Sequence, residues 1–170
     1  MNILNLFNTH KVVEINLSTG LRTGHMLAQH AYKDGSKKFV DNGIFFRMSK
    51  KDADTLVLPG DTNAVGPYFL HYTEELDTTG LASASKYFTV EIENGVCYPR
   101  CIALYPGDTF TTDNYKADVD NAKFATVGTD GVLVLSAEFP QSAQGPVFQA
   151  VKTTMPDGQT VGYQMTVLSV

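Results

Sequence analysis

Glycine-containing turn sequences divide this chain into short segments, and they constrain its fold more than any other feature. Glycine after Asn or Asp accepts the positive φ that tight hairpins require. The segments between the turns are rich in Val, Thr, Phe and Tyr, which suit a pleated, half-buried surface. The pattern therefore predicts an all-β protein. The turns are Asn42-Gly43, Pro59-Gly60-Asp61, Asn94-Gly95, Pro106-Gly107-Asp108, Asp130-Gly131 and Asp157-Gly158.

The clearest strand is Tyr87–Glu93, in which apolar and mostly polar residues alternate. Asn94-Gly95 then turns the chain into Val96–Tyr105, so we predict a hairpin in which Pro99 marks an edge or a bulge. Strands at roughly ten-residue intervals predict a small sandwich or a partly open barrel of short antiparallel strands. Further strands are expected at Gly43–Met48, Thr55–Leu58, Pro67–Tyr72, Thr109–Thr112, Phe124–Val127, Val132–Phe139, Pro146–Thr154 and Thr160–Val167.

The first forty residues differ from the rest of the 170-residue chain. Lys11–Leu17 has the alternation of a strand, but Ser18–Val40 is polar, contains three glycines and shows no sustained period. Segments of this kind usually become ordered against a partner. We therefore expect residues 1–42 to form an extended N-terminal arm and residues 43–170 to form the β-domain.

The net charge of −5 hides an uneven distribution. Residues 1–51 hold eight Lys and Arg against three acids, whereas residues 52–170 hold five bases and fifteen acids. Such segregation suits a basic segment that contacts an acidic surface, although solvated charges placed by chance would look the same. Nucleic acid is not an expected partner, because the folded part is acidic.

Motifs of catalysis are missing from the sequence, which has no nucleophile elbow, phosphate loop, dinucleotide fingerprint or metalloprotease helix. Cys97 and Cys101 would lie about 13 Å apart along one strand, which exceeds the span of a disulfide. Glu91 and Glu93 have the spacing of a glycosidase pair, but an alternating strand places such acids on its solvated face. We expect no enzyme, no cofactor and no metal.

The beginning of the sequence, MNILNLFNTHKVVEINL, lacks the charged and apolar regions of a secretory signal. No apolar run reaches the ~18–20 residues of a membrane span. The expectation is a protein of a reducing compartment with free thiols and no membrane partner.

The order of these signals resembles the head decoration, or capsid-stabilising, proteins of tailed bacteriophages. The resemblance covers residues 40–170 and consists of turn and strand-end motifs. The motifs are Val40-Asp41-Asn42-Gly43-Ile44, Leu58-Pro59-Gly60, Tyr68–Glu75, Tyr87–Val90 with Asn94-Gly95, Tyr98-Pro99-Arg100, Leu104–Phe110 and Ala125–Leu133.

The resemblance implies a non-catalytic virion protein that is assembled in the host cytoplasm. It would bind the major capsid protein on the outer surface of the shell in many copies, with a homotrimer as the implied oligomer. The alternative is a head-fibre, tail or receptor-binding β-module that recognises glycans. From their charge or aromatic character, the candidate capsid-contact residues are Arg22, Lys33, Lys37, Lys38, Arg47, Tyr68 and Tyr72.

Overall fold

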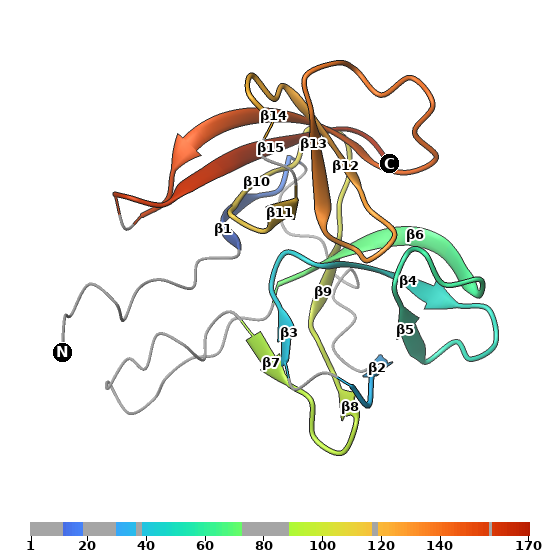
Figure 1. The fold of residues 1–170 in the computed structure, drawn as a ribbon. Coiled ribbons are helices and arrows are strands. Elements are labelled where there is room, and N and C mark those ends of the chain that lie inside the picture. Colours follow the sequence, from blue (N-terminus) through green and yellow to red (C-terminus); the bar gives the residue numbers. More distant parts are fainter. Residues whose placement is uncertain (1–11, 19–29, 37–38, 73–88, 117–118, 157) are drawn as a thin grey trace, which may run out of the picture.

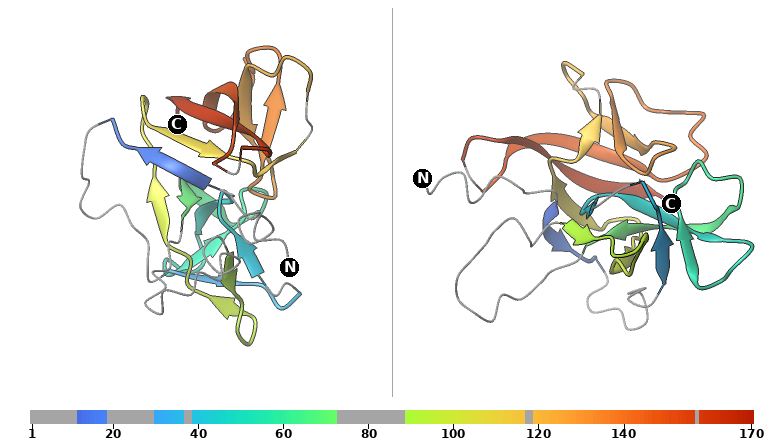
Figure 2. Two further views of the ribbon diagram at one scale, coloured as in Figure 1. Left: turned by 90° about the vertical axis from the view of Figure 1, so that its left-hand side faces the viewer. Right: turned by 60° about the horizontal axis from the view of Figure 1, so that its bottom comes forward.

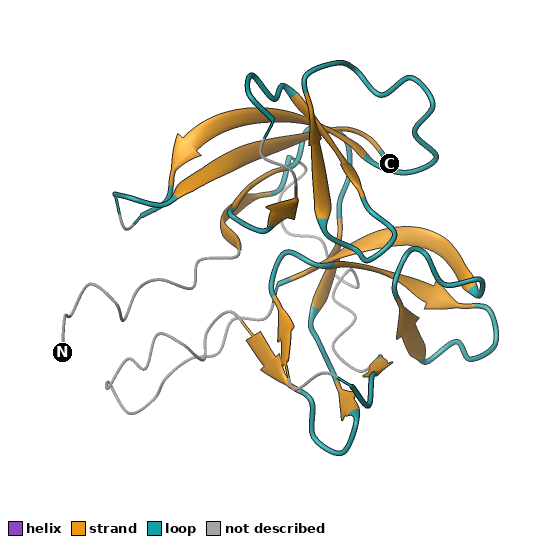
Figure 3. Ribbon diagram, in the orientation of Figure 1, coloured by secondary structure: helices purple, strands orange, loops and turns teal. Residues whose placement is uncertain are grey.

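The computed structural model describes residues 12–18, 30–36, 39–72, 89–116, 119–156 and 158–170. Every regular element in these ranges is a β-strand (Figures 1 and 3). The seven-stranded sheet has the order β1 (Val12–Asn16), β10 (Thr109–Thr112), β15 (Val161–Ser169), β14 (Val147–Thr154), β12 (Phe124–Val127), β13 (Leu133–Ser136) and β11 (Tyr115–Lys116).

Two further sheets complete the described part of the chain, and Figure 2 shows their arrangement from two other directions. The six-stranded sheet has the order β8 (Val96–Cys97), β2 (Ala31–Lys33), β5 (Thr55–Val57), β4 (Phe45–Ser49), β6 (Ala64–His71) and β9 (Cys101–Ala103). The third sheet pairs β3 (Phe39–Asp41) with β7 (Thr89–Glu91).

The all-β prediction is confirmed, and the two large sheets form a small sandwich in which neither closes on itself. Most strand pairs are antiparallel, as expected for short hairpins. Two are not, because β2 runs parallel to β5 and β11 runs parallel to β13. The sheets are therefore mixed, which corrects the expectation of purely antiparallel pairing.

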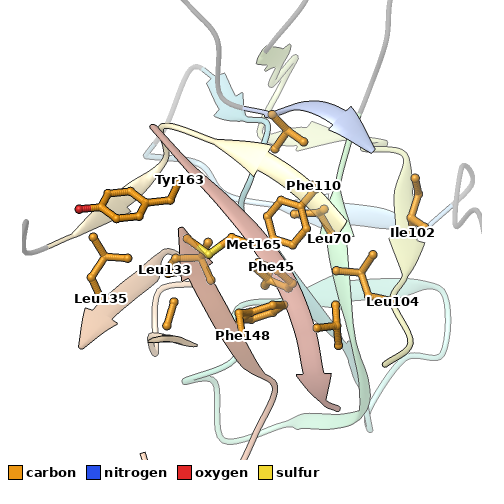
Figure 4. Close-up of a cluster of buried hydrophobic side chains, with 14 residues drawn as sticks. Phe45, Leu70, Ile102, Leu104, Phe110, Leu133, Leu135, Phe148, Tyr163 and Met165 are labelled. Carbon is orange, nitrogen blue, oxygen red and sulfur yellow. The ribbon is translucent and has the colours of Figure 1, made fainter. Parts of the chain in front are cut away.

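The first hydrophobic cluster fills the space between the two large sheets (Figure 4). At its centre Phe45 of β4 meets Phe110 of β10 and Phe148 of β14, with ring centroids 6.2 and 5.5 Å away. Phe110 and Phe148 form an edge-to-face pair at 5.7 Å. These tilted geometries are the favoured ones for buried rings, so the three phenylalanines join the sheets.

The second cluster lies on the opposite face of the six-stranded sheet. Successive strand residues point to opposite faces, so Phe45 faces the first cluster and Phe46 the second. On β6, Leu70 likewise faces the first cluster and Phe69 faces the second. Both faces are thus buried at the start of β4 and at the end of β6, which explains why the apolar residues there run consecutively rather than alternately.

The described residues of the segment 1–42 do not form the expected extended arm. β1 pairs with β10, β2 pairs with β5 and β8, and β3 pairs with β7. Val12, Tyr32 and Val40 from these strands are all buried. The polar residues between the strands obscured any period in the sequence, but each strand buries at least one apolar side chain in a core. Residue 42 is therefore not a boundary between an arm and the β-domain in the described residues.

The turn at Asn94-Gly95 forms as predicted, whereas the hairpin around it does not extend. Both residues have positive φ, 52° and 77°, and a single Glu93–Val96 bridge closes the turn. Beyond that bridge β7 pairs with β3 and β8 pairs with β2. The predicted second strand is divided at Pro99, since proline cannot donate a ladder hydrogen bond.

Candidate interaction site

Arg47 and Tyr68, two of the candidate contact residues, meet on the six-stranded sheet. The Arg47 guanidinium lies over the Tyr68 ring, 4.9 Å from its centroid. A register shift between Phe46 and Met48 of β4 makes this contact possible, because β6 bulges at Gly66-Pro67 opposite it. Arg47 Nε and Nη2 donate hydrogen bonds to the Gly66 carbonyl at 3.1 and 2.8 Å.

The backbone at this bulge suits the residues that form it. Gly66 has a φ of 77°, which only glycine adopts without strain. Pro67 has no N–H to give to a ladder, so a bulge is where a strand tolerates it. We call the pair held here the Arg47–Tyr68 site. Its guanidinium is fixed from one side by a carbonyl and from another by an aromatic face.

The other side of Tyr68 closes against the loop between β13 and β14, which projects on the same side of the molecule as the β4–β6 end (Figure 1). A Cβ built on Gly145 would lie 2.8 Å from the Tyr68 Cζ and Oη, so a larger residue there would displace the Tyr68 ring. A cavity of about 280 Å³ opens beside the ring. It is lined by Tyr68, Thr126, Val127, Pro140, Ser142, Ala143, Gln144, Gly145 and Pro146.

Lys33 lies at a second cavity, of about 560 Å³, where β2 ends beside β5. Its ammonium is 3.8 Å from Asp52, and both side chains are exposed, so the pair contributes little to stability. Asp61, Thr129 and Asp130 add carboxylates and a hydroxyl to the apolar floor. The remaining lining residues are Tyr32, Thr55, Leu56, Val57, Leu58 and Gly60.

Asp130 is paired at the rim of this second cavity with Lys116. Partial burial raises the pKa of Asp130, but the hydrogen bonds from Lys116 and the Val132 amide, together with the Lys116 charge, outweigh it and hold that pKa below its usual value. The carboxylate is therefore ionised at neutral pH. The cavity combines ionised and hydroxyl groups with a largely apolar lining, the mixture that is usual in small-molecule sites.

The other candidate contact residues are not at these sites. Tyr72 follows β6, packs against the first cluster, and donates its backbone N–H to the Arg100 carbonyl at 2.9 Å. Arg22, Lys37 and Lys38 lie outside the described residues. The structure therefore unites Arg47 with Tyr68, places Lys33 at a separate cavity and keeps Tyr72 as a partly buried packing residue.

The thiols and the buried histidine are not activated for chemistry. Burial raises the pKa of the Cys97 thiol to about 11 and raises that of Cys101 further, so both free thiols stay protonated. Burial also lowers the pKa of His71 to about 4, and its neutral Nδ1–H donates to the Asp41 carbonyl at 2.8 Å. Burial therefore disfavours a reactive thiolate at Cys97 or Cys101 and a charged imidazole at His71.

The signal that sequence reasoning missed is the Gly66-Pro67 pair. A Gly-Pro pair inside an apolar run indicates a bulge, and a bulge redirects the side chains on either side of it. Read in that way, the pair would have linked Tyr68 to the strand that carries Arg47.

Comparison with known protein families, with curated proteins and with solved structures gave no match to this chain. Within the ranges that the structure describes, no helix is long and apolar enough to cross a bilayer. The same ranges contain no cluster of three or more His, Cys, Asp or Glu side chains that could hold a metal ion.

Proposed function

We propose that this chain is a virion structural protein of a tailed bacteriophage, which binds the outer surface of the capsid and stabilises the shell without catalysis. Its partner is the major capsid protein, and assembly takes place in the host cytoplasm. The order of turn and strand-end motifs supports the proposal, together with a β-sandwich in which the bulge of β6 presents Arg47 and Tyr68 side by side.

The observation that carries the proposal is the preformed Arg47–Tyr68 site. Arg and Tyr are, with Trp, the side chains enriched at the energetic centres of protein interfaces. Here the bonds to Gly66 and the contact with Gly145 hold both in place before any partner arrives. A prearranged contact loses less conformational entropy on binding, and a capsid repeats it many times, so a modest contact per copy can hold a lattice.

The test is co-sedimentation of the purified protein with undecorated capsids. The variant carries Arg47→Ala and Tyr68→Ala, and we expect it to bind at least about tenfold more weakly, which corresponds to ~1.4 kcal/mol. Tyr98→Ala is the matched control, because Tyr98 is 59% exposed and lies away from the site. Equal binding by the double variant and the control would refute this site, and no binding by wild type would refute the function.

The glycan-binding alternative is supported by the cavity of about 560 Å³ near Lys33. Its volume is within the usual range for ligand sites, and the Asp61 and Asp130 carboxylates can accept hydrogen bonds from sugar hydroxyls. A glycan array separates the two functions. Specific binding that Asp61→Asn weakens would favour the alternative, whereas capsid binding without any sugar signal favours the shell protein.

A further inference from the structure

The sequence contains two Asn-Gly pairs, Asn42-Gly43 and Asn94-Gly95, and the fold places them in opposite environments. An asparagine followed by glycine is chemically labile, because glycine has no side chain to shield its backbone nitrogen from the neighbouring amide. Asn42 is fully buried, whereas Asn94 is exposed and Gly95 is half-buried. The same dipeptide therefore meets solvent at one position and is kept from it at the other.

The backbone of the Asn42-Gly43 pair is fixed from two sides. The Gly43 N–H donates to the His71 carbonyl at 2.9 Å, and the Asn42 carbonyl accepts the Asn114 Nδ2–H at 2.9 Å. A Cβ on Gly43 would lie 3.0 Å from the Asn114 Cβ, so the packing there is tight. With its nitrogen engaged and its side chain away from water, this pair reacts only when the structure opens.

The Asn94-Gly95 pair lies in the turn between β7 and β8, which forms the lowest loop in the view of Figure 1. Among the residues that the structure describes, no group bonds to the Asn94 side chain and none accepts the Gly95 N–H. The Glu93–Val96 bridge closes the turn with N–H···O distances of 3.1 and 3.0 Å. Beyond this bridge β7 and β8 pair with different strands, so the turn can open locally without breaking a ladder.

We propose that Asn94 is a site of spontaneous deamidation in the folded protein, and that its product loosens the edge strand β8. The Gly95 nitrogen loses its proton to solvent and attacks the Asn94 Cγ, which forms a cyclic succinimide and releases the side-chain nitrogen as ammonia. Water then opens the ring. Cleavage of the new N–Cγ bond gives aspartate, and cleavage of the original peptide bond gives isoaspartate. The inference goes beyond the proposed function, because it holds whether or not the chain binds a capsid.

The isoaspartyl product does not fit this turn. It adds a methylene group to the main chain of a turn that has only Asn94 and Gly95 between the bridged residues. The Gly95 carbonyl also accepts the Asp34 N–H at 2.9 Å, which holds the turn against the end of β2. A longer main chain displaces the bridge, this hydrogen bond or both.

Both products also change the charge of the turn. The new carboxylate directly follows Glu93, and Asp34 contacts the same turn through its backbone. Added negative charge between acidic residues disfavours the closed turn. Because β8 is an edge strand that pairs only with β2, it is the strand that separates first. Its separation exposes Cys97, which is only 3% exposed in the unmodified protein.

Peptide mapping by mass spectrometry after incubation of the full chain at mildly alkaline pH tests the site. In the folded chain Asn94 should deamidate at least about tenfold faster than Asn42, because reaction at Asn42 requires global opening. In concentrated urea the two should react at comparable rates, which shows that the fold makes the difference. An Asn94 that stays intact in the folded chain, or that reacts no faster than Asn42, overturns the inference.

Alkylation of Cys97 tests the effect on β8, with Cys101 as the internal reference because it is buried on β9. After incubation, the isoaspartyl form of wild type should be alkylated at Cys97 at least about threefold faster than fresh protein, since labelling follows the population of the open form. Asn94→Gly cannot deamidate and keeps a sequence suited to the turn, so incubation should not change its labelling.

Freshly prepared Asn94→Asp carries the new charge without the extra methylene, and it should be alkylated more slowly than the isoaspartyl form. Equal labelling of fresh and isoaspartyl wild type would overturn the loosening of β8. So would an equal acceleration in incubated Asn94→Gly. Labelling of Asn94→Asp as fast as that of the isoaspartyl form would overturn the role of the longer main chain.

Discussion

Asp108 joins segments that are far apart in the sequence, and it is a buried charged residue. Its Oδ1 accepts hydrogen bonds from the Ser18 backbone N–H at 2.8 Å and from the Ser18 hydroxyl at 3.0 Å. Its Oδ2 accepts one from the Tyr105 N–H at 2.8 Å, which closes the turn at Pro106-Gly107. The carboxylate therefore fastens the end of the β1 segment to the turn before β10.

Replacing Asp108 by Ala should destabilise the protein by about 2–3 kcal/mol, because the backbone N–H groups of Ser18 and Tyr105 lose this acceptor. Asp108→Asn keeps one carbonyl oxygen and should cost less. Urea unfolding of both variants measures the difference in the free energy of unfolding. Equal stability of wild type and Asp108→Ala would show that solvent replaces these bonds at no cost.

Gly131 has no room for a side chain where the two large sheets meet. Its carbonyl accepts the Phe45 N–H at 2.8 Å, and a Cβ on it would lie 2.4 Å from the Phe45 carbonyl oxygen. Gly131→Ala should therefore cost the ~1–2 kcal/mol of its positive φ and a further ~1–3 kcal/mol of overpacking. Gly158→Ala is the control, since its φ is also positive but no atom lies within 4 Å.

Thermal unfolding of the two alanine variants separates the cost of the positive φ from the cost of the steric clash with Phe45. We expect the Gly131 variant to melt well below the Gly158 variant. Equal melting temperatures would mean that the backbone at Phe45 moves aside easily.

At the scale of elements, the N-terminal strands are parts of the sheets. Deleting residues 1–41 removes β1, β2 and β3, and with them Val12, Tyr32 and Val40 from the two clusters. A buried large apolar side chain contributes ~1.5–3 kcal/mol, and a whole domain is stable by only about 5–15 kcal/mol. The truncated chain should therefore lose cooperative unfolding, as monitored by near-ultraviolet circular dichroism.

The control for this truncation is deletion of residues 1–11, which removes none of the described strands. It should keep a sharp transition. A sharp transition in the longer truncation as well would mean that β1 to β3 dock on an independent domain.

How much the sequence predicts depends on how local each feature is. Gly131 and Gly95 have the positive φ that their Asp-Gly and Asn-Gly pairs indicate, and β10 and β12 begin and end at the predicted residues. Which strand pairs with which is not local. β7 pairs with β3 because Val40 and Ile92 share the second cluster, and no alternation within either strand encodes that.

The candidate site likewise has a part that local sequence indicates and a part that depends on strand pairing. Residue type alone was enough to select Arg47 and Tyr68, since cations and tyrosines suit interfaces. Their contact depends on a register shift between two strands, which no property of either residue indicates.

For the whole molecule, His71 makes stability depend on pH. Its pKa is about 4 in the folded protein against an ordinary value of 6.5, so the unfolded chain binds a proton first as the pH falls. The contribution of His71 to the free energy of unfolding should be fully present above pH ~6.5. It should decrease by up to about 3 kcal/mol as the pH approaches ~4. Carboxylates with lowered pKa, such as Asp52 and Asp130, lose their contributions below that range.

Urea unfolding at a series of pH values checks this dependence, and His71→Gln should flatten it between pH ~6.5 and ~4. The imidazole proton signals of wild type provide a test that does not require the variant to fold. They should show His71 still neutral at pH ~5. A titration midpoint near its ordinary value would contradict the burial of this ring.

The burial of β4 on both faces has a consequence for how the molecule opens. β5 and β6 occupy its two edges, and at Phe45 and Phe46 hydrophobic clusters cover both sides, so we expect no local fluctuation to bring these two amides to solvent. Their hydrogens can exchange with deuterium only when the entire structure comes apart. The slowest amides of Phe45 and Phe46 should therefore report the global free energy of unfolding directly under native conditions.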